Sequence, residues 1–297
     1  MYQQHFGLTE LPFGITPDTS FAFACISHQE ALNTLLVAVK NGEGFIKITG
    51  EVGTGKTLLC RRFLSTLDQN FVSAYIPNPY LEPRALLLAL ADELRVVIPQ
   101  DSDQHQLMKL LTHALLEFAR EGKSVVLCLD EVQAMPLETL EALRLLTNLE
   151  TEKRKLLQVV LFGQPELDAR LAQESVRQLT QRIAFQYRLG ALRGEELDYY
   201  LEHRLRVAGH RGNRVFGPAA VKAMARVSQG VPRVVNILAH KAMLLAYGEG
   251  SQQVLTHHVY RSAADTPAAA GATAQWLPYG YAALVVLIGV AAWVSLR

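Results

Sequence analysis

The chain has 297 residues, 49% of them hydrophobic, so it can form one large or two modest domains with a buried core. Lys and Arg number 29 and Asp and Glu 28, a balance that argues against the basic surface typical of nucleic-acid-binding proteins. Cys25, Cys60 and Cys128 are widely spaced and form no C-x-x-C pair, which favours a reducing compartment over a disulfide framework or zinc site. The N-terminus predicts no cleavable export signal.

Residues 1–44 are expected to form an N-terminal extension of loops and one helix. Ser27 and Glu30 have the spacing of a capping box, and the helix they would open ends near Asn41-Gly42. Apolar residues within it recur at helical spacing, which indicates one buried face.

Residues 45–190 are predicted to form an α/β domain. Short apolar runs, rich in β-branched residues, alternate here with amphipathic helical segments, and such alternation predicts a parallel sheet covered on both faces. The predicted strands are Phe45–Thr49, Val72–Ile76, Val125–Leu129, Leu157–Phe162 and Ile183–Leu189.

A phosphate-binding loop is predicted directly after the first strand. Residues 50–57 match G-x-x-x-x-G-K-[ST] and stand between a predicted strand and a predicted helix. Lys56 would reach the β and γ phosphates of ATP, and the Thr57 hydroxyl would bind Mg²⁺. A glycine-rich structural turn is the alternative. The predicted nucleotide-binding residues are Gly50, Glu51, Val52, Gly53, Thr54, Gly55, Lys56, Thr57, Leu58 and Asp130.

Two carboxylates follow the apolar strand that ends at Leu129. Because ionised groups at the end of a buried strand need a partner, Asp130 is assigned to the Mg²⁺ shell and Glu131 to polarising the attacking water. An ordinary acidic turn is the alternative. The predicted strand Val72–Ile76 lies in sequence between the phosphate loop and the strand that ends at Leu129. The strand before the phosphate loop and the strand before the two carboxylates are therefore not consecutive.

Three further polar side chains are candidates for catalysis. Gln164 follows the fourth strand and could orient water against the γ-phosphate, although a simple turn residue is the alternative. Arg182, preferred over Arg177, could act in trans as a finger on a neighbouring subunit's nucleotide, or lie on a solvated helix face. Arg233 could report the nucleotide state in cis, or be an ordinary surface arginine.

The remainder of the chain is predicted to be helical. Residues 191–262 contain four helical segments and are expected to form a small helical lid domain. Residues 263–276 have the composition of a flexible linker. Residues 277–296 are mostly apolar and uncharged, long enough for one C-terminal transmembrane helix, with a buried core helix as the alternative.

Together these motifs resemble the AAA+ superfamily, and specifically the general secretion pathway A (ExeA) family of membrane-associated ATPases. The resemblance is spread over about residues 1 to 260 and rests on Phe6-Gly7-Leu8, Pro12-Phe13, Pro17-Asp18, the 50–57 loop, Leu129-Asp130-Glu131, Phe162-Gly163-Gln164-Pro165-Glu166-Leu167, Gln181-Arg182-Ile183 and Gly230-Val231-Pro232-Arg233-Val234-Val235-Asn236. Larger members continue into a peptidoglycan-binding segment. This chain is expected to lack one and so resembles the branch that serves the mannose-sensitive haemagglutinin (MSHA) type IV pilus.

The resemblance implies that ATP and Mg²⁺ bind between the α/β and helical domains of a homo-oligomer, for which a hexamer is the usual superfamily form. Hydrolysis would assist assembly of a type IV pilus or type II secretion machine. Because ATP is cytosolic, the ATPase domain is expected in the cytoplasm on a single-pass inner-membrane anchor, with pilus or secretion proteins as partners and nucleic acid not expected. The alternatives are a DNA-transposition helper ATPase and a nucleotide-gated scaffold without significant turnover.

Overall fold

A computed structural model describes residues 2–16, 18–21, 23, 25–150 and 154–269. The chain divides into two compact units. The described residues of 24–190 form the α/β unit, and the described residues of 1–23 and 191–269 form the helical unit. The first 44 residues are therefore divided between the two units.

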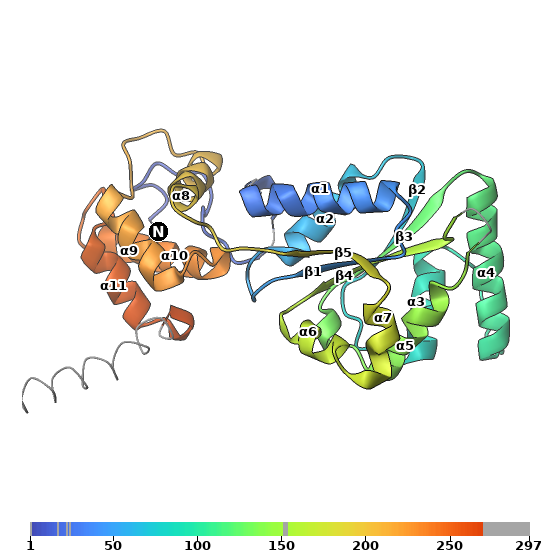
Figure 1. Ribbon diagram of the computed structural model, residues 1–297. Coiled ribbons are helices and arrows are strands. Elements are labelled where there is room, and N and C mark those ends of the chain that lie inside the picture. The colour runs from blue at the N-terminus through green and yellow to red at the C-terminus, as the bar shows by residue number, and fades with distance from the viewer. Residues whose placement is uncertain (1, 17, 22, 24, 151–153, 270–297) are drawn as a thin grey trace, which may run out of the picture. The chain divides into compact units, whose positions relative to one another are not determined.

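A five-stranded parallel sheet forms the centre of the α/β unit (Figure 1). Its order is β2-β3-β4-β1-β5, so β4 lies between the strand before the phosphate loop and the strand before the two carboxylates. The fold therefore confirms the predicted parallel α/β sheet and shows that the two motif strands are not neighbours. The strands are β1 Phe45–Thr49, β2 Phe71–Ile76, β3 Ser124–Leu129, β4 Leu157–Gly163 and β5 Ile183–Arg188.

Alternate residues of the central strands enter separate cores on the two faces of the sheet. On β4, Val159 and Leu161 pack with α3, α4 and α5, whereas Val160 and Phe162 pack with α1 and α2. This burial on both faces explains why the strands read as nearly continuous apolar runs. Figure 1 shows α1 and α2 on one face and α3, α5, α6 and α7 on the other.

The helix predicted to end near Asn41-Gly42 ends at Lys40, and a helix follows the phosphate loop as predicted. One prediction is wrong: α1 starts at Ile26, its N-cap is Cys25, and no side chain caps it, so Ser27 lies inside the first turn. A capping box does open α4, where Asp103 accepts from the Gln106 backbone N–H. The helices are α1 Ile26–Lys40, α2 Lys56–Thr66, α3 Pro83–Glu93, α4 Gln104–Arg120, α5 Leu137–Leu146, α6 Glu166–Leu171 and α7 Arg177–Thr180, with 3-10 turns η2 Val132–Ala134 and η3 Glu174–Val176.

The helical unit contains α8 Glu196–Val207, α9 Pro218–Ser228, α10 Pro232–Gly248 and α11 Thr256–Ala264, with η1 Thr19–Phe21 before α1. The N-terminal segment folds as part of this unit. Tyr2 is buried and hydrogen-bonds His240, and its burial raises the pKa of the Tyr2 hydroxyl to about 12. Arg204 of α8 donates to the Pro12 carbonyl.

The packed part of the helical unit runs past the expected start of the linker at 263. Thr266 is 4% exposed and accepts a hydrogen bond from Lys241, and Ala269 is 1% exposed. The predicted transmembrane segment at 277–296 lies outside the described residues. Among the residues that the structure does describe, no helix has the length and apolar character needed to cross a membrane.

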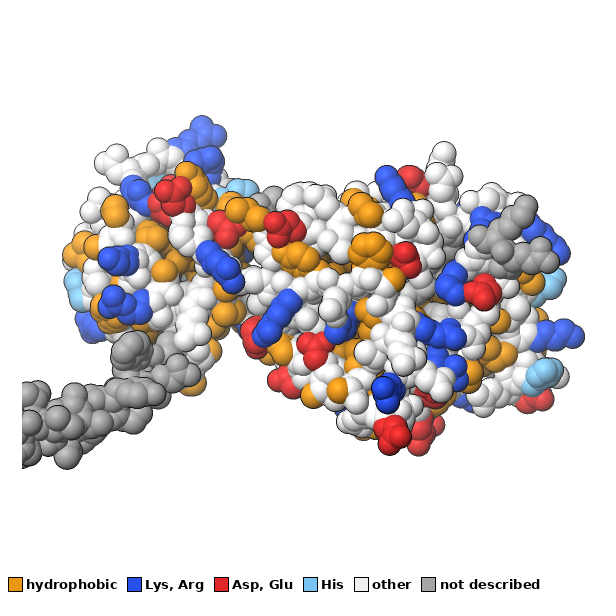
Figure 2. All heavy atoms as spheres, viewed as in Figure 1, with side chains coloured by type: hydrophobic (Ala, Val, Ile, Leu, Met, Phe, Trp, Pro, Cys, Tyr) orange, Lys and Arg blue, Asp and Glu red, His pale blue; other side chains and the backbone are white. Residues whose placement is uncertain are grey.

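Charges of both signs are interspersed over the face of the molecule shown in Figure 2. No continuous basic surface covers the described residues visible there, which agrees with the net charge of +1.

Candidate nucleotide site

The loop between β1 and α2 has the backbone that a phosphate cradle needs. Gly53 and Gly55 have φ of 82° and 92°, a left-handed region that glycine adopts without strain. Gly50 is closely packed, since a Cβ there would lie 2.7 Å from Thr54 Oγ1. Its N–H donates to Gly163 O of β4 across 3.2 Å, which fixes the start of the loop against the sheet.

Lys56 is the first residue of α2 and is only 5% exposed. Its Nζ donates to Gly50 O at 2.8 Å and Glu51 O at 3.1 Å. Burial lowers the pKa of the ammonium, and the nearby carboxylates, first Glu131 and then Asp130, partly oppose that shift. A buried cation held by carbonyl oxygens is suited to exchange them for phosphate oxygens.

Asp130 follows β3 and is 2% exposed. Its Oδ2 accepts from the Thr57 hydroxyl at 2.6 Å, and its Oδ1 accepts from the Glu131 backbone N–H at 2.9 Å. Burial raises the pKa of Asp130, because a charge removed from water without a cation is disfavoured. A hydroxyl and a carboxylate in contact are a donor set that suits Mg²⁺.

Two thiols pack α2 against β3 behind this pair. Cys60 of α2 contacts Cys128 of β3, and both are fully buried. The hydrogen bond with Cys128, followed by burial, raises the pKa of the Cys60 thiol. This buried contact packs α2 against β3 and so holds Thr57 and Asp130 on facing elements.

Glu131 occupies a strained position. Its φ is 55°, a left-handed conformation that non-glycine residues adopt at a cost of about 1–3 kcal/mol. Its Oε2 accepts a hydrogen bond from Gln164 Nε2 at 2.9 Å. Such strain at the end of a strand is typical of active-site residues that the surrounding structure holds in place.

Sequence reasoning missed Gln133 in the η2 turn. Its side-chain amide donates to Glu131 Oε2, and its Oε1 accepts from the Gln164 backbone N–H at 3.0 Å. Gln133 therefore connects the predicted base with the predicted γ-phosphate sensor. A polar residue two positions after the acidic pair was the available signal, but such residues are common in turns.

The sheet order explains how these groups meet. Because parallel strands end at one edge, Gln164 after β4 lies between the phosphate loop after β1 and the carboxylates after β3. The structure thus brings together five of the predicted side chains: Lys56, Thr57, Asp130, Glu131 and Gln164.

The two predicted arginines are placed elsewhere. Arg182 directly precedes β5, whose first residue Ile183 pairs with Phe45, so it lies at the amino-terminal ends of the strands, opposite the phosphate loop. Its Nη1 donates to Thr147 Oγ1 at 3.4 Å. Arg233 is exposed in the first turn of α10, in the helical unit. Their roles in trans and in cis remain predictions.

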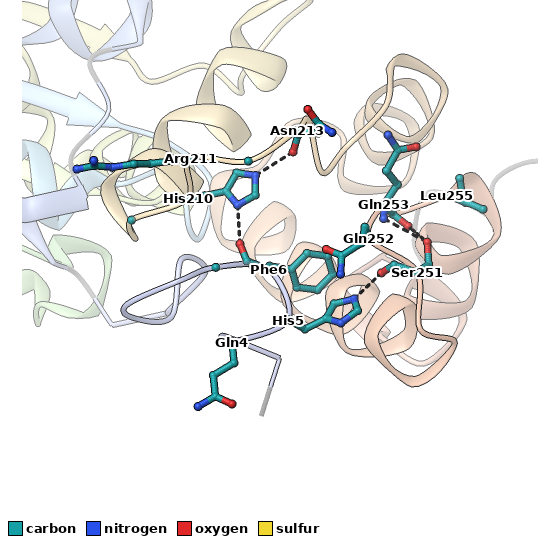
Figure 3. Close-up of a pocket in the computed structure, with 13 residues that line it drawn as sticks. Gln4, His5, Phe6, His210, Arg211, Asn213, Ser251, Gln252, Gln253 and Leu255 are labelled. Carbon is teal, nitrogen blue, oxygen red and sulfur yellow. Dashed lines mark hydrogen bonds between the residues drawn. The ribbon is translucent and has the colours of Figure 1, made fainter.

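A hollow of about 930 Å³ in the helical unit is a different feature (Figure 3). It lies between the N-terminal segment, the α8–α9 loop and the turn before α11. His210 bridges the Phe6 and Asn213 carbonyls, and His5 contacts Ser251 O. None of the predicted nucleotide-site residues lines it.

Glu249, His257 and His258 bring three metal-ligand atoms within 4.8 Å of one another. His258 Nδ1, however, accepts the Leu255 backbone N–H at 2.9 Å, which leaves its hydrogen on Nε2, facing Glu249 at 2.8 Å. A metal-bound histidine normally donates from its second nitrogen, whereas this one accepts. We therefore interpret the cluster as a hydrogen-bonded group in which His258 donates to Glu249, whose charged partner is Arg261 at 3.2 Å.

Comparisons with known proteins agree with this geometry. A family model described as an AAA domain matches residues 39–171. Solved structures with similar folds include the ORC2 protein of Aeropyrum pernix (TM-score 0.59, 17% identity, 85% of this chain and 72% of that one). A second is Cdc6p of Pyrobaculum aerophilum (TM-score 0.63, 18% identity, 82% of this chain and 70% of that one). A third is the RuvB motor of Thermotoga maritima (TM-score 0.55, 16% identity, 82% of this chain and 72% of that one).

The fold is that of a P-loop NTPase, and the matched residues 39–171 identify an AAA domain within it. The chain is related to general secretion pathway protein A of Aeromonas hydrophila, with 42% identity over 255 residues, or 86% of this chain. It spans 46% of the length of that relative.

Proposed function

We propose that this chain is a membrane-anchored ATPase that binds ATP with Mg²⁺ and hydrolyses it to assist assembly of a cell-envelope machine. The observation that carries the proposal is the set of contacts from Thr57 to Asp130 and from Glu131 to Gln164 at one sheet edge. A glycine-rich structural turn would not need a buried lysine and a buried aspartate beside it.

The residues present fit both ATP and its metal. Asp130 and Lys56 are both buried. Burial raises the pKa of Asp130 and lowers the pKa of Lys56, so each charged form is disfavoured until an ion of opposite charge binds beside it. Thr57 and Asp130 would hold Mg²⁺, and Lys56 would bind the β and γ phosphates. When bound, Mg²⁺ would neutralise charge on the phosphate oxygens.

Glu131 is the residue we assign to activating water. Two amides engage its Oε2 and so fix the carboxylate, and Oε1 is the oxygen that we assign to accept a proton from the attacking water. Gln164, between the phosphate loop and Glu131, would orient that water toward the γ-phosphate. We also propose a homo-oligomer in which Arg182 reaches a neighbour's site, because that side chain is remote from the phosphate loop of its own sheet.

The cellular role is inferred from the relative and from residues 277–296. General secretion pathway protein A supports service to a secretion machine. This apolar segment has 20 residues, and as a helix rising about 1.5 Å per residue it would span roughly 30 Å, the thickness of the hydrocarbon core of a membrane. The ATPase units would then lie in the cytoplasm. We propose a type II secretion or type IV pilus assembly role, most like the MSHA pilus protein MshM.

Binding and role are tested separately. Thermal unfolding of the full chain with ATP should show stabilisation that requires Mg²⁺ in the wild type and is lost in Thr57→Val, with Thr66→Val as an exposed threonine control. Equal stabilisation of Thr57→Val would contradict the assigned site. Deleting the gene in its host should abolish surface pili or type II secretion, and intact assembly of both would overturn the proposed role.

A further inference from the structure

The first turn of α1 lies directly against the phosphate loop. His28 Nε2 donates to the Thr54 carbonyl at 2.7 Å, because a carbonyl oxygen can only accept. The ring also covers the next residue, since a Cβ on Gly55 would lie 2.7 Å from His28 Cε1. Gly55 is therefore required both by its positive φ and by the ring beside it.

This contact fixes the orientation of a peptide group in the loop. A trans peptide directs its C=O and N–H in opposite directions. The bond from His28 to Thr54 O therefore also sets the direction of the Gly55 N–H, one of the donors that a phosphate loop offers to its ligand.

The same turn holds the end of the α/β unit. Ser27 Oγ accepts the Gly190 backbone N–H at 2.8 Å, and Glu30 accepts the Tyr187 hydroxyl at 2.6 Å. Gly190 is the last residue of the unit, and the chain enters the unit just before α1. The chain therefore leaves the α/β unit directly after a residue that this turn holds.

Beyond the crossing, Leu192 is fixed to the helical unit. Its N–H donates to Gly230 O at 2.9 Å. Gly230 has a φ of 73°, and a Cβ there would lie 2.1 Å from Leu192 O, so no other residue fits. Gly230 stands just before α10, whose first turn carries Arg233.

We propose that His28 is a positioning residue of the phosphate loop, and that the Ser27-His28 turn couples nucleotide occupancy to the chain crossing that leads to Arg233. The proposal rests on the proposed nucleotide binding and deepens it. Neither side chain caps the helix, since Cys25 is the N-cap and α1 has no side-chain cap hydrogen bond. Both instead reach segments that are distant in sequence: Thr54 and Gly190.

The first test measures Mg²⁺-ADP affinity of the full chain by calorimetry. His28→Ala should weaken binding by about 3- to 10-fold, the loss expected for one neutral hydrogen bond, and His28→Gln should recover it because its amide can still donate to Thr54 O. Gln29→Ala, an exposed neighbour, is the control and should bind as the wild type. Unchanged affinity in His28→Ala, or no recovery in His28→Gln, would overturn the positioning role.

The second test measures trypsin cleavage at Arg188 and Arg193, which flank the crossing. Saturating ADP should slow cleavage several-fold in the wild type. Ser27→Ala should keep the wild-type affinity but lose that protection, whereas a merely structural role would change cleavage equally with and without ADP. Protection retained in Ser27→Ala would overturn the coupling, and a wild type that binds no nucleotide would instead overturn the proposed function on which it rests.

Discussion

The Thr57 hydroxyl donates to Asp130 Oδ2 across 2.6 Å. This bond joins α2, which follows β1 and the phosphate loop, to the end of β3, from which β1 is separated by β4. Asp130 is held there at a cost, because the residue is 2% exposed and burial raises the pKa of its carboxyl group. This burial lowers the stability of the nucleotide-free protein, and in the proposed function the same two side chains hold Mg²⁺.

Replacing Asp130 with Asn should separate stability from function. Asn keeps the shape of the side chain and removes the buried charge, so the nucleotide-free protein should melt higher, by about 2–4 °C for each kcal/mol gained. The same variant should lose stabilisation by Mg²⁺-ATP. Differential scanning calorimetry would measure both, with the exposed Asp101→Asn as control. A lower Tm for Asp130→Asn would contradict the account.

The pH dependence of unfolding should carry the signature of Asp130. Its folded pKa is raised by burial, so between the ordinary Asp value and the raised value the folded state binds more protons than the unfolded state. The contribution of Asp130 to the unfolding free energy is therefore complete at low pH and falls as pH rises through that window. Denaturant unfolding across mild acid should show this slope in the wild type and a flatter one in Asp130→Asn. Parallel slopes would show that Asp130 is not the source.

Gln133 should matter for turnover more than for binding. In the proposed mechanism Gln164 orients the attacking water and Gln133 holds Glu131, so Gln133→Leu should lower kcat by roughly 10- to 100-fold with little change in KM. Steady-state phosphate release measures this split, and the exposed Gln104→Leu is the matched control. A rise in KM with kcat unchanged would indicate a binding role instead.

Arg182 should act only between subunits. Arg182→Ala should lose turnover while ATP binding remains, because its side chain lies at the amino-terminal ends of its own strands, away from the phosphate loop. Mixing it with Glu131→Gln, which keeps its arginine but lacks the base, should restore part of the activity. A mixture as inactive as its components would argue against a finger in trans.

A truncation that removes the apolar segment at 277–296 should keep all the packed residues of the helical unit. Thr266 and Ala269 are both buried, so the packed unit continues past Asp265. A chain ending at Gln275 should keep the wild-type Tm, whereas one ending at Asp265 should melt lower because it loses the contacts of Thr266 and Ala269. Thermal unfolding of the two truncated chains measures the difference, and equal melting temperatures would show that these contacts are unimportant.

Much of the α/β unit could be predicted because each motif is local in sequence. The phosphate loop contains its own glycines, lysine and threonine. Asp130 and Gln164 directly follow predicted parallel strands, which puts both at the carboxyl edge of the sheet whatever the strand order. The spacing of the motifs predicts only that the strands before the phosphate loop and before the two carboxylates are not consecutive in sequence. The insertion of β4 between β1 and β3, and the position of β5 beside β1, needed the structure.

The parts that could not be predicted depend on contacts between distant segments. Ser27 has the spacing of a helix cap, yet it accepts from Gly190, 163 positions away. Tyr2 and Phe6 are buried in the helical unit, but they belong to no periodic apolar pattern from which this burial could be predicted. Gln133 looks like a turn residue until Glu131 and Gln164 are seen on either side of it.

The most direct test is phosphate release from ATP by the full-length protein in lipid, measured over a wide range of protein concentration beside Lys56→Ala and Glu131→Gln. Turnover that rises with concentration in the wild type and vanishes in both variants is the predicted result, with Glu131→Gln still binding ATP. ATP binding without turnover at any concentration, or turnover that survives in Glu131→Gln, would contradict an ATPase built on this site.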